Sequence, residues 1–146
     1  MDDLLDVLLI EDNSTDADLT MRALKKKNNG LKIKHVEDGA EALDFIFSQG
    51  VYSNRNPSFL PKLILMDLQL PRINGHEVLK QIKNNERTRK TPIVILTSSS
   101  HLQDVMECYS NGANAYMVKP MDFEEYILQV SSAVHFWLEI NYLPTY

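Results

Sequence analysis

Acidic side chains follow two apolar runs of the chain, at the point where each run ends. Glu11 and Asp12 come directly after the run at 7–10, and Asp67 comes directly after the run at 63–66. Carboxylates that lie close together repel one another, and some must take up a proton unless a cation lies among them. Carboxylate oxygens are ligands that Mg²⁺ accepts, and an aspartate can itself accept a phosphoryl group. These residue types indicate a divalent-metal site in which Asp67 can act as a nucleophile.

A hydroxyl and an amine follow two further apolar runs. Thr97 comes after the run at 93–96, and Lys119 comes after the run at 115–118. Phosphoryl transfer depends mainly on positioning the phosphoryl group and neutralising its oxygens, and hydroxyl and ammonium groups supply hydrogen bonds and charge for this purpose. An aspartate at a strand end is often only a helix cap or a turn residue, so each position alone also has a purely structural interpretation. All of them together, at successive strand ends, favour a phosphoryl-transfer site.

These residues depend for their positions on strands that alternate with helical patterns along the chain. The runs at 7–10, 63–66 and 93–96 are apolar at consecutive positions, which is typical of strands buried on both faces of a parallel sheet. The run at 31–36 alternates apolar and polar residues and suits an edge strand. We predict an α/β, flavodoxin-like fold, which is a doubly wound, five-stranded parallel sheet in the order 2-1-3-4-5 with five helices. Sites in such folds lie outside the carboxyl ends of the strands.

Helix boundaries are marked by polar cap signals. Asn74 with Glu77, and Ser100 with Gln103, have the spacing of a capping box, and Gly112 suits a helix end. The spacing i, i+3, i+4, i+7 of an amphipathic helix is found at Leu102, Val105, Met106 and Tyr109. These signals predict helices after the third and fourth strands.

The composition is that of one globular domain over residues 1–146. Apolar residues make up 44% and charged residues 24%, which allows a packed core. The net charge of −5 argues against nucleic acid as a partner, and the single cysteine excludes a disulfide framework within the chain. The acidic start lacks the features of a signal peptide, and no apolar run approaches the roughly 18 residues of a membrane span. We therefore expect a cytoplasmic location and no membrane partner.

The chain resembles the receiver domain of two-component response regulators over about residues 5 to 135. The matching motifs are LLIEDN, LILMDLQLPRINGHE, VILTSSS and AYMVKPMD. Each motif alone is weak, and together they are highly specific. The resemblance implies that Asp67 receives a phosphoryl group from a phosphohistidine on a sensor histidine kinase. It also implies a protein that assists its own phosphorylation and dephosphorylation but is not otherwise an enzyme, and that signals by binding partners.

The resemblance assigns the metal ligands. Asp12 and Asp67 would bind Mg²⁺ directly, with Mn²⁺ as an acceptable substitute, and Glu11 would act through water. The backbone carbonyl of Gln69 would be the third protein ligand.

The resemblance also assigns residues around the phosphoryl group. Thr97 and Lys119 would hold phosphoryl oxygens. Tyr116 would be the switch aromatic, which turns inward as Thr97 moves toward the phosphoryl group. The bond between Lys119 and Pro120 would be cis.

The chain departs from most receivers at two places. Asp12 and Asp67 are 55 residues apart, and a polar loop at 50–60 accounts for the excess length. The last helix can run from about 122 to about 141, which is roughly 30 Å at 1.5 Å per residue. The residues expected to overhang the sheet are Phe136, Trp137, Ile140, Tyr142 and Leu143. Such a tail either folds back on the domain or forms a partner surface, for which Trp and Tyr are suited.

Both departures are similar to the phytochrome-associated response regulators of cyanobacteria. The resemblance implies a bacterial phytochrome as a candidate kinase, a C-terminal extension at about 136–146 and no output domain. It also implies a homodimer formed through the last strand, the last helix and the tail. Signals would leave through the surface between residues 102 and 143.

Three other functions are open to such a chain. An aspartyl-phosphate phosphatase of the haloacid dehalogenase type also has a nucleophilic aspartate at a strand end, but it needs a second acid where this chain has Gln69. A flavodoxin needs a phosphate-binding loop after the first strand, where Glu11 and Asp12 would repel the phosphate. A receiver-like binding module that works without phosphorylation would normally have lost an acid or the lysine, and this chain retains them.

Overall fold

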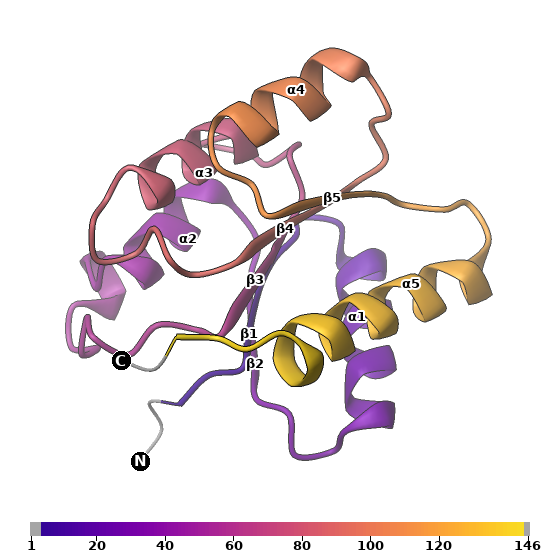
Figure 1. Ribbon diagram of the computed structural model, residues 1–146. Coiled ribbons are helices and arrows are strands. Elements are labelled where there is room, and N and C mark those ends of the chain that lie inside the picture. The colour runs from indigo at the N-terminus through magenta and orange to yellow at the C-terminus, as the bar shows by residue number, and fades with distance from the viewer. Residues whose placement is uncertain (1–3, 145–146) are drawn as a thin grey trace.

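The computed structural model describes residues 4–144 as a parallel sheet covered by helices on both faces (Figure 1). The strands lie in the order β2-β1-β3-β4-β5, and all four pairs are parallel. The strands are β1 (Val7–Ile10), β2 (Ile33–Val36), β3 (Leu63–Met66), β4 (Ile93–Thr97) and β5 (Ala115–Val118). The predicted fold class and strand order are confirmed. The edge strand β2 begins two residues later than the alternating run at 31–36.

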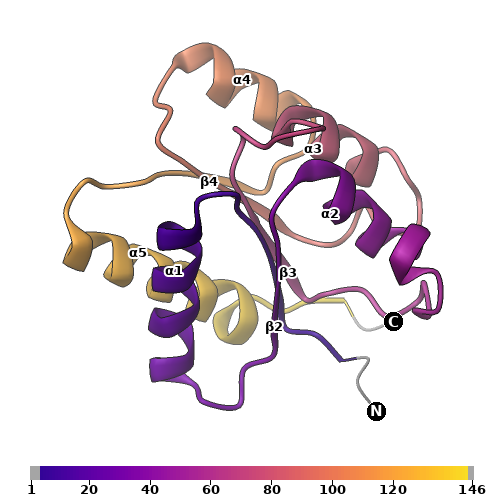
Figure 2. The ribbon, with the colours of Figure 1, turned by 180° about the vertical axis from the view of Figure 1, so that it is seen from behind.

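Helices cover both faces of the sheet, as the two opposite views show (Figure 2). On the first face lie α1 (Ser14–Lys27) and α5 (Phe123–His135). On the second lie α2 (Gly39–Ile46), α3 (Gly75–Lys83) and α4 (Leu102–Ser110). None of the helices in residues 4–144 is long and apolar enough to cross a membrane.

The central strands form the core because every residue of β1, β3 and β4 is buried. Alternate residues point to opposite faces of a strand. Leu8 and Ile64 accordingly pack in the cluster beneath α2, α3 and α4, whereas Leu9 and Leu65 pack in the cluster beneath α1 and α5. The consecutive apolar residues of these strands thus supply both cores.

The strand register brings the carboxyl ends together. Ile10 pairs with Met66, and Met66 pairs with Ile95, so the residues that follow β1 and β3 emerge side by side. On the next pair, Thr97 is opposite Val118. The rim formed by these strand ends is the place where the sequence predicts a site.

Two of the three predicted cap signals mark helix boundaries in the structure. The side chain of Asn74 accepts a hydrogen bond from the backbone of Glu77, and Gly112 follows α4 with a positive φ of 98°. The predicted pair of Ser100 and Gln103 is wrong, because α4 begins after His101, whose side chain makes no capping hydrogen bond.

Helix α4 exposes its apolar stripe. Leu102, Met106 and Tyr109 are 71%, 60% and 51% exposed, whereas Cys108 is buried and faces the core. The predicted helix is confirmed, but its spacing marks an outward surface instead of a core contact.

The long loop at 50–60 is fastened to α2. The ring of Tyr52 packs edge-on against Phe45 with a centroid distance of 5.1 Å, and its hydroxyl donates a hydrogen bond of 2.6 Å to Glu41. Arg55 donates to the backbone oxygens of Phe45 and Phe59. The extra residues between Asp12 and Asp67 therefore form an attached surface loop.

The last helix continues past α5 in a π-helical turn at Phe136–Ile140, and Asn141 ends it. From there the chain extends away from α5 toward the side of the sheet on which α2 lies (Figure 1). Phe136, Ile140 and Tyr142 are 44%, 63% and 93% exposed, as predicted for an overhang. Trp137 and Leu143 are only half-buried, and Trp137 packs against the core cluster of the α1 and α5 face. Residues 145 and 146 of the predicted extension lie outside the described residues.

Candidate functional site

Three carboxylates meet at the rim above β1 and β3. Glu11, Asp12 and Asp67 each have an oxygen within 4.8 Å of the others. Glu11 and Asp67 are buried, whereas Asp12 is exposed. A hard divalent cation accepts carboxylate oxygens and keeps part of its water shell, so two buried acids beside an exposed one suit its requirements. The carboxylate set predicted for a metal is thus brought together.

The ammonium of Lys119 reaches into the same rim. Its Nζ donates hydrogen bonds to Glu11 Oε1 at 2.7 Å and to Asp67 Oδ2 at 3.1 Å. The side chain of Lys119 is only 10% exposed, so the ion pairs are shielded from water. Removing one partner from such a buried pair leaves an uncompensated charge, which is costly.

A further carboxylate, Asp16, also binds this ammonium and was missed by the sequence reasoning. Asp16 Oδ2 accepts a hydrogen bond of 2.9 Å from Lys119 Nζ. A helix that begins at the carboxyl end of a strand places its first turn at the same rim. That rule, applied to an acid in the first turn of α1, is the signal that could have found Asp16.

Burial and charge act against each other in this cluster. Burial raises the pKa of the Glu11 carboxyl to about 7, and the hydrogen bond and charge of Lys119 offset only part of that rise. Burial also opposes the charged form of Lys119. This effect is outweighed by the hydrogen bond and charge of Glu11, the hydrogen bond of Asp16 and the charge of Asp67, which raise the pKa of Lys119 above its ordinary value. The lysine therefore stays protonated at neutral pH and neutralises part of the acidic rim.

The backbone around Asp67 is held at close range. Its N–H donates to the carbonyl of Ile10 at 3.0 Å, and its Oδ1 accepts a hydrogen bond of 3.3 Å from the N–H of Gln69. Gly75, the first residue of α3, donates its N–H to Leu68 O at 2.8 Å. A Cβ on Gly75 would lie 2.5 Å from the backbone oxygen of Asp67, so only glycine allows α3 to approach this turn.

Thr97 and Tyr116 surround the loop that follows β4. Thr97 is fully buried, and its carbonyl accepts a hydrogen bond of 2.7 Å from the N–H of Lys119. Tyr116 is half-buried beside the core, and its hydroxyl donates to Ser99 O at 2.9 Å. The aromatic side chain is thus turned inward in this structure. Its role as a switch and the ligand role of the Gln69 carbonyl stay predictions.

The predicted cis bond between Lys119 and Pro120 is wrong. Residues 4–144 contain no cis peptide bond. The trans isomer is the commoner one at X–Pro bonds because it is favoured by about 0.5–1 kcal/mol.

A polar network connects the loop after β4 to α3 and α4. Ser99 Oγ donates to Asp104 Oδ2 at 2.6 Å, and His76 Nε2 lies 3.1 Å from Asp104 Oδ1. The hydrogen bonds from Ser99 and then His76 lower the pKa of the Asp104 carboxyl. The sequence reasoning missed this network, because its members come from three separate segments and form no motif.

The fold and the site together define the class of receiver domains, in which a sheet-end aspartate lies beside acids and a lysine. The family model described as "Response regulator receiver domain" matches residues 7–131, and the chain belongs to this family.

Two relatives are similar over almost the whole chain. Probable methanogenesis regulatory protein FilR2 of Methanothrix harundinacea (strain 6Ac) is 40% identical over 138 residues, which cover 94% of this chain and 86% of that protein. Response regulator Rcp1 of Synechocystis sp. (strain ATCC 27184 / PCC 6803 / Kazusa) is 36% identical over 138 residues, which cover 94% of this chain and 92% of that protein. The phosphorylated cyanobacterial phytochrome response regulator RcpA superposes with a TM-score of 0.90 at 32% identity, covering 97% of this chain and 99% of that one. The Mn²⁺-bound form of Rcp1 superposes with a TM-score of 0.88 at 35% identity, covering 95% of this chain and 98% of that one.

Proposed function

We propose that Asp67 is the phosphoacceptor of a single receiver domain formed by residues 1–146. The observation that carries this proposal is the position of its carboxylate, which accepts a hydrogen bond from the Lys119 ammonium and lies in one cluster with the acids Glu11 and Asp12. The lysine ammonium, together with a divalent cation bound in this cluster, would neutralise charge on a phosphoryl group attached to the Asp67 carboxylate.

In the proposed reaction, a carboxylate oxygen of Asp67 attacks the phosphorus of a phosphohistidine on a sensor kinase. The phosphorus–nitrogen bond breaks, and its electron pair stays on the imidazole of the kinase. Lys119 donates hydrogen bonds to a phosphoryl oxygen and to the site's acids, and Thr97 holds a second phosphoryl oxygen. Hydrolysis by water later returns the Asp67 carboxylate and inorganic phosphate.

The residues that would hold a divalent cation are Asp12 and Asp67 directly, Glu11 through water, and the backbone carbonyl of Gln69 as the third protein ligand. The observed proximity of the carboxylate oxygens supports this assignment, as does the relative whose structure is described as Mn²⁺-bound. Bound Mg²⁺ or Mn²⁺ supplies positive charge beside the transferring group.

We propose that the output is a change in what the protein binds and that the protein, apart from assisting its own phosphorylation and dephosphorylation, is not an enzyme. Thr97 and Tyr116 would respond to the phosphoryl group. Ser99 lies between them, and its carbonyl accepts the hydrogen bond from the Tyr116 hydroxyl. The exposed residues of α4 then provide a surface whose partners can be exchanged.

The proposed phosphodonor is a sensor histidine kinase. A bacterial phytochrome is one candidate, because a similar solved structure is that of the cyanobacterial phytochrome response regulator RcpA. The comparable identity to FilR2, which is described as a methanogenesis regulator, supports kinases with other inputs equally well. The cytoplasmic location and the absence of nucleic acid as a partner stay predictions.

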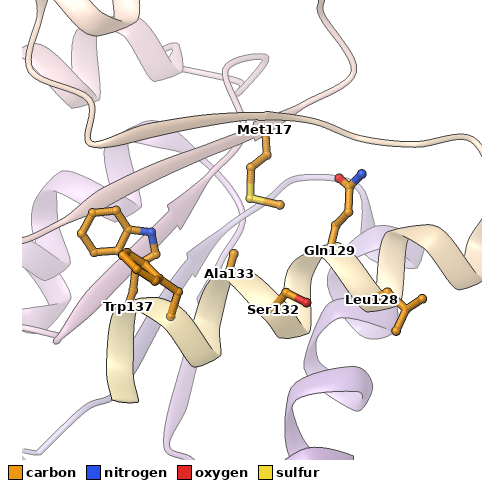
Figure 3. Close-up of a pocket in the computed structure, with 7 residues that line it drawn as sticks. Met117, Leu128, Gln129, Ser132, Ala133 and Trp137 are labelled. Carbon is orange, nitrogen blue, oxygen red and sulfur yellow. The ribbon is translucent and has the colours of Figure 1, made fainter. Parts of the chain in front are cut away.

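We further propose a homodimer formed by β5, α5 and the tail. An apolar groove lies between β5 and α5, and Figure 3 shows Met117 pointing at the helix between Trp137 at one end and Leu128 at the other. Exposed Phe136 and Ile140 continue this surface along the π-helical turn. A second copy that pairs the two α5 helices would bury these residues, and interface cores favour such aromatic side chains.

Phosphoryl uptake from acetyl phosphate and Mg²⁺, followed by intact-mass analysis, tests the phosphoacceptor. Wild type is expected to gain one phosphoryl group and Asp67→Asn none. Equal uptake by both proteins would contradict the assignment.

A further inference from the structure

Asp16 shares the ammonium of Lys119 with the two buried acids of the site. An ammonium has three N–H donors. In this structure they have three carboxylate acceptors, with distances of 2.7 Å to Glu11, 2.9 Å to Asp16 and 3.1 Å to Asp67. Each acceptor comes from a different segment, so the lysine side chain is held from three directions.

The position of the Asp16 side chain is set by the first turn of α1. Its N–H donates to Asn13 Oδ1 at 3.0 Å, and its carbonyl accepts a hydrogen bond of 2.7 Å from Thr20 Oγ1. Thr20 is buried and in turn lies 2.8 Å from the hydroxyl of the buried Tyr126 on α5. The backbone that carries Asp16 is therefore fastened both to its own helix and to its neighbour.

An acid in the first turn of a helix also has a simpler explanation, which is a favourable interaction with the helix dipole. That explanation requires no partner for the carboxylate. Asp18, two residues further along the same helix, has an ordinary surface contact, because it is exposed and forms an ion pair with Arg22 in the next turn. Asp16 differs because its carboxylate points into the site and meets a nearly buried ammonium.

Among residues 4–144, Asp16 is also the one acceptor of the Lys119 ammonium that is not in the three-carboxylate metal cluster. A cation bound by Glu11 and Asp67, or a phosphoryl group on Asp67, would compete with the ammonium for these two carboxylates. Neither group would engage the carboxylate of Asp16. A free lysine side chain loses rotamer entropy when it is fixed, so a contact that already holds it lowers this cost.

We propose that Asp16 is a positioning residue that holds the Lys119 ammonium beside Asp67 during phosphoryl transfer. This inference rests on the proposed function of Asp67. Asp16 touches neither the phosphorus nor the attacking oxygen, and it acts only through Lys119.

The first experiment measures the initial rate of phosphoryl uptake against the concentration of acetyl phosphate, with saturating Mg²⁺. Asp16→Ala is expected to lower the maximal rate about tenfold, which corresponds to about 1.4 kcal/mol, with little change in the half-saturating concentration. Asp16→Asn is expected to lose less, because its amide oxygen still accepts a hydrogen bond. Asp18→Asn, with the same loss of charge on the same helix, is the matched control and is expected to retain the wild-type rate.

The second experiment repeats the Asp16→Ala change in a Lys119→Ala protein. If Asp16 acts only through Lys119, the second substitution has no further effect on the rate. An independent readout, which needs no turnover, is the ¹⁵N NMR signal of the Lys119 ammonium in the metal-free protein. We expect this signal to be protected from exchange in wild type and in Asp18→Asn. We expect it to be lost in Asp16→Ala.

Two results would overturn the proposal. Faster uptake by the Asp16 variants would mean that the carboxylate repels the anionic donor. A protected Lys119 signal in Asp16→Ala would mean that the two acids of the metal cluster suffice. Failure of the proposed function itself is distinguishable, because wild type would then take up no phosphoryl group at Asp67.

Discussion

Lys119 donates a hydrogen bond of 3.1 Å to Asp67 although 52 residues separate them in the chain. The contact exists because β3 and β5 end at the same rim of a parallel sheet, with β4 between them. A cation is thus held beside the one aspartate that lies at the end of the central strand.

The acidic rim is expected to make the protein more stable when a divalent cation binds. Mg²⁺ at 100 times its dissociation constant would raise the free energy of unfolding by about 2.7 kcal/mol. Asp12→Ala is expected to abolish this gain with little effect on the metal-free protein, because Asp12 is exposed. Thermal unfolding of wild type and Asp12→Ala, with and without Mg²⁺, measures this gain in stability, and Asp18→Asn is the charge-matched control. An equal gain in Asp12→Ala would remove Asp12 from the metal site.

Gly75→Ala is expected to destabilise the protein by about 1–3 kcal/mol, because the new Cβ would overlap the backbone of the Asp67 turn. The nearest atoms would be Asp67 O at 2.5 Å and Leu68 Cα at 2.6 Å. Gly30→Ala is the matched control, since its Cβ would meet nothing closer than 3.6 Å. Urea unfolding of the three proteins gives the comparison, and equal stability of both variants would contradict the close approach of α3.

Tyr52 is expected to make the long loop sensitive to alkali. Burial, and then the hydrogen bond to Glu41, raise the pKa of Tyr52 from 10.0 to about 12. Because the pKa is higher in the folded state, the contribution of the neutral hydroxyl is complete below pH 10 and is lost as the pH rises toward 12. The stability difference between wild type and Tyr52→Phe should therefore shrink from pH 8 to pH 11.5 in urea unfolding. Tyr142→Phe, at a residue 93% exposed, should show no such change, and a constant difference for Tyr52 would refute the prediction.

The proposed dimer is expected to dissociate when charge enters its apolar surface. Phe136→Glu and Ile140→Glu should each convert a dimer into a monomer in light scattering, since both side chains are exposed on the π-helical turn. Val51→Glu introduces the same group at a residue that is 88% exposed on the long loop, and it should leave the mass unchanged. A wild-type monomer, or dimers of all three variants, would exclude this interface.

The strands and the main residues of the site were predictable because each rests on a local pattern. Consecutive apolar residues predict a buried parallel strand, and the residue after such a strand lies at a known rim. Glu11 and Asp67 follow from this rule alone, whereas Lys119 follows the edge strand β5, which is only partly buried. The rule needs no knowledge of which strands are neighbours.

What was missed depends on contacts between elements. Asp16 is indistinguishable in sequence from any acid in a first helical turn, and only the position of Lys119 gives it a partner. The stripe of α4 has the spacing of a buried face, but the register of the helix turns Cys108 inward and leaves Leu102 and Met106 exposed. Periodicity predicts that one side of a helix is apolar, and packing decides what that side meets.

The position of the phosphoryl group tests the central claim most directly. Borohydride attacks the acyl carbon of an aspartyl phosphate, releases phosphate and, with further reduction of the aldehyde, leaves homoserine. Peptide mass spectrometry of protein treated with acetyl phosphate, Mg²⁺ and then borohydride is expected to find homoserine at position 67, and not in a sample without acetyl phosphate. Homoserine at Asp12 or Asp16 instead, or its absence from wild type, would contradict the account.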